Sequence, residues 1–172
     1  MKKTLVIAIL LMAVAAFGAD MKLAYINSER LRQEYDAFAD AQAQFDKDVS
    51  AWEKDALEKE EELISLQTEL EQQALLLSED KKQERLRLIE QKKQEYQRFL
   101  SEIFGTGGRA ERKNAELTTP LLETINDVLI TLAQREGYDL IVDVAGGSVA
   151  YINENLDITD RLLDELNSMP GR

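Results

Sequence analysis

Two short stretches of the sequence carry residue types that could bind phosphate or metal. "GTGGRAERK", from Gly105 to Lys113, has glycines and a basic end, as a phosphate-binding loop does. That loop needs the pattern G-x-x-x-x-G-K-[ST] between a strand and a helix, and neither the spacing nor the context is present. The run Glu60–Glu62 is acidic enough for a metal ion, but consecutive positions of a helix point in different directions. We therefore expect a helix break and a solvated helix face at these places.

A third stretch, "NENLDITDRLLDE", has part of the spacing of a calcium-binding loop. Asn153, Asn155 and Asp157 stand at alternate positions, where such a loop carries oxygen ligands. Ile158 replaces the glycine that the loop requires, and Asp164 replaces its final glutamate. The stretch is therefore predicted to be a polar loop and a helix cap.

The composition excludes several classes of chemistry. The 172-residue chain has no His and no Cys, so it lacks the commonest general base, reactive thiols and the ligands of soft metals. An enzyme would have to work with carboxylates, Lys, Ser or Tyr, and the sequence shows no constellation of them. The net charge of −12 argues against a nucleic-acid binder, because phosphate contacts need a basic face. We predict a protein that is not an enzyme, binds no nucleic acid and needs no metal or cofactor.

The first residues are typical of a secretory signal peptide. A basic start is followed by the unbroken apolar run Leu5–Phe17, and small residues precede a cleavage site at Ala19. The alternative is a membrane anchor, but a spanning helix needs about 20 residues and this run has 13. We expect residues 1–18 to be removed and residues 19–172 to form one exported domain.

A heptad repeat dominates the following part of the chain. Ser28 can cap a helix after the short apolar segment "KLAYIN". From Leu31 to Leu77, steps of four and three residues meet 14 positions, of which 11 are apolar. The overall hydrophobic content would give about six. Such a seam is the pattern of a helix that packs along another helix, and it predicts one helix from Ser28 to Leu77, about 75 Å long.

Ser78 marks the start of a second helix. Its hydroxyl is followed by Glu79 and Asp80, and acids are favourable at the positive end of a helix. A tight turn before Ser78 makes an antiparallel helical hairpin. The return helix has its own seam of Leu86, Ile89, Lys93, Tyr96, Leu100 and Ile103.

The return helix carries two interruptions. Gly105, Gly107 and Gly108 fall together, although a glycine inside a helix costs about 1 kcal/mol relative to alanine. The heptad count nevertheless continues through them. Further on, Thr119-Pro120 can either restart a helix or kink a continuous one, and Gly137 is a plausible residue to end it.

Two interpretations of the glycines remain open. Pairing about a turn near Ser78 places Trp52, the single tryptophan, opposite Phe104. In one interpretation the glycines give the indole room and the arm is rigid. In the other, which we favour, Gly105, Gly107 and Gly108 form a hinge about halfway along the arm, with Trp52 and Phe104 as its packed pivot. Irregular backbone is then expected between Phe104 and Arg109.

Short apolar runs predict a small β head. "KLAYIN", "DLIVDV" and "SVAYI" are expected strands, and the last two should form a hairpin around "AGG". A short helix capped by Thr159 or Asp157 follows and ends near Asn167. The predicted fold class is α+β, with a head of three short strands (residues 19–28 and 136–172) and a long antiparallel helical-hairpin arm (residues 29–135, tip near 75–82). Such a head has little core, and association through it is the natural way to gain one.

This layout resembles the OmpH/Skp family of periplasmic chaperones. The residues that carry the match are "AYIN", "LLLSEDKKQE" at the turn and, above all, "LTTPLLETINDVLITLAQREGYDLIVDVAGGSVAYINENLDITDRLLDELN". The resemblance covers nearly all of residues 19–172. It implies a homotrimer with one central body of strands and three arms that enclose a cavity. It also implies ATP-independent holding of unfolded outer-membrane proteins in the periplasm.

The implied trimer would be assembled through apolar residues of the predicted strands. They are Leu23, Tyr25, Ile26, Leu140, Ile141, Val142, Val149 and Tyr151.

The charge of this chain departs from that of the best-known family members, which are basic. Residues 28–77 hold 14 acids and 5 bases, and residues 136–172 hold 8 acids and 2 bases, whereas residues 78–98 hold 5 acids and 7 bases. Only the arm tip keeps a basic surplus. Its bases are expected to assist capture of acidic clients or approach to anionic lipid, unless they are only the outside of a coiled coil. They are Lys81, Lys82, Arg85, Arg87, Lys92 and Lys93.

Apolar side chains off the seam are the expected contacts for clients. They are Ile64, Leu75, Leu76 and Phe104. The alternative is a structural coiled-coil spacer of the cell envelope that never binds unfolded chains. A spacer should be stiff and polar on its exposed faces, so these residues and the glycines favour the holdase.

Overall fold

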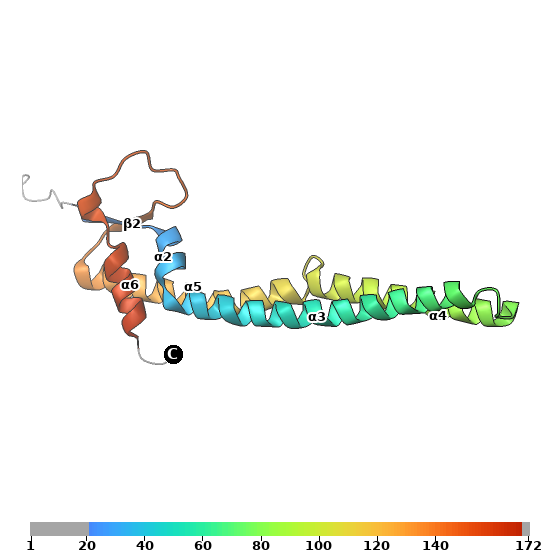
Figure 1. The fold of residues 1–172 in the computed structure, drawn as a ribbon. Helices are drawn as coiled ribbons and strands as arrows, with labels where there is room; N and C mark the ends of the chain where they lie inside the picture. Colours follow the sequence, from blue (N-terminus) through green and yellow to red (C-terminus); the bar gives the residue numbers. More distant parts are fainter. Residues whose placement is uncertain (1–20, 170–172) are drawn as a thin grey trace, which may run out of the picture. The chain divides into compact units, whose positions relative to one another are not determined.

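The computed structural model describes residues 21–169, so the predicted signal peptide lies outside the described residues. The chain divides into a head unit, residues 21–35 and 125–169, and an arm unit, residues 36–124. None of the helices within the described part is long and apolar enough to cross a membrane. The elements in chain order (Figure 1) are β1 (Leu23–Ile26), α2 (Ser28–Glu34), α3 (Asp36–Gln73), α4 (Glu79–Phe104), α5 (Arg109–Glu136), β2 (Leu140–Asp143), the 3-10 helix η1 (Glu154–Leu156) and α6 (Thr159–Ser168).

The sheet of the head unit pairs β1 with β2 in parallel. The register runs from Leu23 opposite Leu140 to Ile26 opposite Asp143, and Asp157 adds an isolated parallel bridge to Tyr25. Parallel strands need a long crossover, and here the chain between β1 and β2 is the entire arm. The two predicted segments "KLAYIN" and "DLIVDV" are therefore strands, but they pair with each other.

The predicted hairpin between "DLIVDV" and "SVAYI" is wrong. Residues 148–152 form no strand in the described chain, because β2 makes its ladder with β1 instead. After β2 the chain turns away: the Asp143 carboxylate accepts from the Ala145 N–H at 3.0 Å, and Gly147 has φ +69°. Tyr151 in this segment is 88% exposed.

The long helix predicted from Ser28 to Leu77 is broken at Tyr35. Its cap is Asn27 rather than Ser28, since the Asn27 side chain accepts from the backbone N–H groups of Glu29 and Arg30. Tyr35 has extended backbone, with φ −81° and ψ 110°. Leu31 and Tyr35 are both buried in the head unit, so the first two positions of the predicted seam pack there and only the remainder belongs to the arm.

The core of the head unit is formed by α6 against its neighbours. Leu162, Leu163 and Leu166 of α6 are buried, as is Leu132 of α5; fully burying a side chain of this size stabilises a fold by about 1.5–3 kcal/mol. The cap position of α6 is Ile158, without a side-chain cap bond, so neither predicted residue is the cap; Asp157 lies one residue earlier, and its carboxylate accepts from the Thr159 N–H at 2.8 Å. Thr159 is the first residue of the helix, and its buried hydroxyl accepts from the Asn27 N–H at 3.0 Å.

The arm unit is the predicted antiparallel hairpin. On α3 the predicted seam positions from Phe45 to Leu70 all turn away from solvent, and Trp52 and Ala56 are buried. The Ser78 side chain caps α4 by accepting from the Lys81 N–H, so the predicted helix start is confirmed. Near the tip the return seam differs from the prediction by one position.

The shift of the return seam concerns two positions. Leu86 is 48% exposed, while the neighbouring Arg85 is half-buried. Likewise Lys92, rather than Lys93, turns inward. The reason is that the charged ends of Arg85 and Lys92 reach acids of α3, at Glu69 and Glu62, which turns these two side chains toward that helix.

Helix α5 continues through Pro120 and ends at a glycine. Pro120 lies inside the helix, so Thr119-Pro120 does not restart it. Gly137 adopts φ +72°, and the Tyr138 N–H reaches back to the Ala133 carbonyl at 3.0 Å. This is the bond of a glycine-ended helix, as predicted for Gly137.

Candidate functional site: the exposed surface of the helical hairpin

The glycine loop, residues 105–108, separates α4 from α5. A Cβ atom on Gly105 would overlap the carbonyl of Ser101, and one on Gly108 would lie 2.5 Å from the carbonyl oxygen of Ile103. Gly107 has φ +69°, which side-chain-bearing residues rarely adopt. All three glycines are thus needed by the loop's own backbone, and the nearest atoms in each crowded case belong to residues 101, 103 and 105, not to the indole of Trp52.

The glycine loop is held by the first turn of α5. The carboxylate of Glu111, three residues into this helix, accepts from the Gly107 N–H at 2.7 Å. The Arg112 guanidinium donates to the Gly107 carbonyl, and the Arg112 N–H donates to the Gly108 carbonyl at 3.1 Å. The backbone between Phe104 and Arg109 is therefore irregular but well bonded.

Trp52 lies at this loop with Arg109 over its ring. The Arg109 guanidinium is 5.3 Å from the ring centroid, within the range of a cation–π interaction. Trp52 is 9% exposed, whereas Phe104, its predicted partner, is 46% exposed. The neighbour that the structure gives to the indole is thus the first residue of α5. Whether the loop bends stays a prediction.

Apolar side chains are exposed along the arm unit, most of all at its tip. Leu75 is 99% exposed and Leu76 is 86% exposed, and both lie in the turn between α3 and α4. Ile64 and Phe104, the other two predicted client contacts, are about half exposed on the helices. Leu57 is 53% exposed and was missed, although its place off the α3 seam could have identified it.

Four of the six predicted tip bases are engaged by acids. Lys81 contacts Glu84 at 2.6 Å and Lys82 contacts Glu79 at 2.7 Å, both within α4. Bonding from Lys81 lowers the pKa of Glu84.

Two further bases join α4 to α3. Lys92 contacts Glu62 at 2.7 Å, and Arg85 lies 3.8 Å from Glu69. The hydrogen bond to Glu62 raises the pKa of Lys92. Arg87 and Lys93 have no ion pair with any described residue, so they are the tip bases that face solvent without a partner acid.

The predicted assembly residues of the head unit fall into two groups. Tyr25 and Ile26 are buried within the unit, whereas Leu23 and Leu140, which are register partners, are 40% and 50% exposed. Tyr151 is almost fully exposed. The remaining three predicted residues are half-buried: Ile141, Val142 and Val149.

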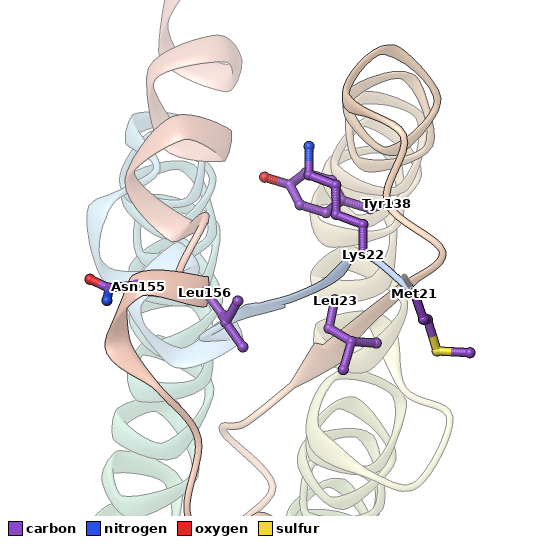
Figure 2. Close-up of a pocket in the computed structure, with 6 residues that line it drawn as sticks. All are labelled: Met21, Lys22, Leu23, Tyr138, Asn155 and Leu156. Carbon is purple, nitrogen blue, oxygen red and sulfur yellow. The ribbon is translucent and has the colours of Figure 1, made fainter. Parts of the chain in front are cut away.

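A pocket of about 510 Å³ opens beside β1. Figure 2 shows Leu156, Leu23 and Met21 along one side of it, with Lys22 next to the Tyr138 ring. The Lys22 ammonium lies 4.5 Å from the Tyr138 centroid and donates to the Glu136 carbonyl at 2.6 Å. The pocket presents mainly apolar surface. No group of three or more metal-ligating side chains occurs in residues 21–169.

A small parallel sheet joined in sequence to a long helical hairpin, with apolar residues exposed on the hairpin, defines a coiled-coil α+β protein. The chain belongs to the family described as outer membrane protein (OmpH-like), whose model matches residues 22–166. Membership of this family supports a chaperone role in general terms.

The fold is shared with a crystal structure from Caulobacter crescentus CB15 that is described as an OmpH-like outer membrane chaperone. The two chains are 14% identical and superpose with a TM-score of 0.77, over 87% of this chain and 86% of the other. Among curated proteins, no significant match to this sequence was found. The likeness confirms the predicted α+β class with a helical hairpin.

Proposed function

We propose that this protein is an ATP-independent periplasmic holdase that binds unfolded outer-membrane proteins on its arms. The observation that carries the proposal is the pair Leu75 and Leu76, which are 99% and 86% exposed at the arm tip. Adjacent large apolar side chains at a turn are unfavourable in water, and covering each of them is worth up to about 1.5–3 kcal/mol. An unfolded chain with exposed apolar segments can supply that cover.

Several weak contacts suit the task of holding a client without ATP. Leu57, Ile64 and Phe104 are each about half exposed along the arm unit, so a client can be bound at more than one place. Binding lowers the free concentration of the unfolded chain by mass action and so delays its aggregation. Release needs only a competing site, since no single contact is strong.

The two unpaired bases at the tip give the binding surface an electrostatic component. Arg87 and Lys93 are without an ion pair among the described residues, in a chain whose net charge is −12. They would attract acidic segments of clients or anionic lipid. The exposed leucines of the tip turn would supply apolar contact to either.

A homotrimer assembled through the head unit would complete the molecule. The sheet of β1 and β2 is too small for an independent core, and its exposed pair Leu23 and Leu140 offers apolar surface to another copy. The segment 148–152, unpaired in one chain, is free to add a strand to a neighbouring copy's sheet.

The test is suppression of aggregation when a urea-unfolded outer-membrane β-barrel is diluted into buffer without ATP. Wild-type protein should suppress aggregation. The double variant Leu75→Ser/Leu76→Ser should bind the client at least about tenfold more weakly, which corresponds to a loss of about 1.4 kcal/mol. The matched control is Gln72→Ser/Gln73→Ser, a change at the same tip that removes no apolar side chain; it should act as wild type. Failure of the wild-type protein to suppress aggregation would reject the holdase and leave the coiled-coil spacer.

A further inference from the structure

The two sides of the hairpin differ in length across the glycine loop. Glu62 contacts Lys92 at 2.7 Å, and Asp48 contacts Lys113 at 3.6 Å. From 48 to 62 is 14 residues on α3, but from 92 to 113 is 21 residues on the return side. Both differences are whole heptads, so the two ion pairs occupy equivalent positions on both helices. The return side therefore holds one heptad more than α3 over the same length.

The additional heptad of the return side lies at the glycine loop and not at the tip. A third pair, Glu69 with Arg85, is seven residues from the Glu62–Lys92 pair on each helix. Between Lys92 and the tip, α3 and α4 therefore have equal numbers of residues over the same length. The backbone between Lys92 and Lys113 is helical except at residues 105–108, and Figure 1 shows this loop standing out from the hairpin. About residues 104–110 thus form one extruded heptad, meaning a heptad with no counterpart on α3, although Arg109 still packs over Trp52.

The residues at the tip of the arm favour a longer α3 and a turn that lies later in the sequence. The tip turn consists of Ala74, Leu75, Leu76 and Leu77, which are among the strongest helix formers. Leu77 was also the last position of the α3 seam. The next residues, Ser78 to Lys81, are polar and suit a turn. If α3 extended through Leu77 and the turn moved to these polar residues, the exposed leucines would join a helix.

We propose that the glycine loop is a stored heptad, and that its absorption into the return helix slides α4 by seven residues along α3 and lengthens the arm. Because the slide is a whole heptad, apolar positions meet apolar positions again. Lys92 would exchange Glu62 for Glu69, which lies one heptad nearer the tip. The slide amounts to about 10 Å between the helices, at 1.5 Å per residue. Shared between both sides of the turn, it extends the arm by about 5 Å.

We call the observed arrangement the stored register and the arrangement after the slide the extended register. The two form a switch of the kind in which one element moves past another by whole turns. The stored register keeps glycine out of a helix and keeps the Glu62–Lys92 pair. The extended register gains helix at Ala74–Leu77 and covers part of the leucine surface. The proposal concerns the free protein and does not depend on client binding, so its failure and that of the holdase can be told apart.

The experiment measures the distance between spin labels on the two helices by double electron–electron resonance. Ala43→Cys on α3 and Gln97→Cys on α4 are both exposed, and the chain has no other cysteine. Labelled protein is diluted with unlabelled protein so that only distances within one chain are recorded. In the stored register the labels give one distance, and in the extended register a distance longer by about 10 Å.

Three variants decide the proposal. Gly105→Ala/Gly107→Ala/Gly108→Ala fits a helix but not the loop, so it should move most of the population to the longer distance. Glu62→Ala, a surface change that frees Lys92, should raise the longer-distance population without any substitution in the loop. Deletion of residues 104–110 removes the stored heptad and should keep the wild-type distance alone.

Two results would overturn the stored heptad. A wild-type distance distribution in both the Glu62→Ala protein and the triple alanine protein would show that the helices do not slide. A deletion variant whose labels lie at a different distance from wild type would show that residues 104–110 are not an extruded heptad. Helical content measured by circular dichroism serves as the control for folding, and Glu62→Ala decides the question if the triple variant does not fold.

Discussion

The bases at the arm tip differ in what they can still bind. Lys81 and Lys82 donate to acids of their own helix at 2.6 and 2.7 Å, so a client carboxylate or a lipid phosphate must compete with those acids. Arg87 and Lys93 have no such competitor among the described residues. Long-range attraction depends on the total charge, whereas contact depends on the free donors.

Neutralising the unpaired bases should therefore change the dissociation rate of a client, whereas neutralising the paired bases should not. Arg87→Gln/Lys93→Gln and the matched control Lys81→Gln/Lys82→Gln change the net charge equally, so both should slow association with an acidic client to a similar extent at low salt. Only the first should also speed dissociation, by up to about fivefold per base, because an exposed ion pair is worth up to about 1 kcal/mol. Stopped-flow or surface-based kinetics at two salt concentrations would show both effects. Equal dissociation rates for the two variants would contradict the distinction.

At the scale of the element, the glycine loop interrupts the helical hydrogen bonds of the arm between α4 and α5. Its turn bonds join Gly105 to Ser101 and Gly108 to Gly105 at 2.9 and 2.8 Å, and its remaining support comes from side chains of α5. Local opening costs least where backbone bonds are exposed and few. A hinge at this place would let the arm bend about Trp52.

Hydrogen exchange tests the hinge directly. Amides of residues 105–109 should exchange faster than those of residues 95–100, which lie inside α4. Peptide-resolved mass spectrometry of the native protein gives both values from one sample. Equal protection of the two segments would mean that the loop is rigid and that its glycines serve only its backbone.

The heptad pattern predicted the hairpin but could not reveal the stored heptad. Positions from Phe45 to Leu70 pack as predicted because a seam depends on local spacing alone. An insertion of seven residues leaves that spacing in phase, so counting by four and three passes through Gly105–Gly108 without a sign of it. The extra length appears only when ion pairs on both sides, such as Glu62–Lys92 and Asp48–Lys113, are compared.

The break at Tyr35 and the exposed tip also show what local sequence pattern cannot predict. Tyr35 continues the apolar seam, yet it is buried in the head unit and its backbone is extended. Leu77 also continues the seam, yet it follows the end of α3 at Gln73. Local pattern identifies an apolar face, but which partner covers that face depends on contacts that are distant in sequence.

At the scale of the whole molecule, the exposed register pair Leu23 and Leu140 predicts association. Light scattering of residues 19–172 at micromolar concentration should give the mass of a trimer. Leu23→Glu/Leu140→Glu places two charges on the exposed register pair and should give monomers, since burying an unpaired charge is strongly unfavourable. The matched change Leu122→Glu, at a leucine of the arm unit that is 58% exposed, should leave the trimer intact. A monomer mass for the wild-type chain would reject assembly.

The head was less predictable than the arm because its pairing is non-local. "DLIVDV" and "SVAYI" are close in sequence and suggest a hairpin, but β2 pairs with β1, whose first residue Leu23 stands opposite Leu140. Nothing in the local pattern distinguishes a strand that pairs with its neighbour from one that pairs across the arm. The end of α5 was more local, and Gly137 acts as predicted.

The parallel pairing of Leu23 with Leu140 has a consequence for the order of folding. A contact between residues so distant in the chain carries a large loop-closure cost, and such contacts form late unless the intervening chain is already ordered. The helical hairpin is built from contacts centred on its own turn, so it can form first and bring the two strands near each other. When the chain emerges N-terminus first, β1 must wait, without its partner strand, until almost all of the arm has followed.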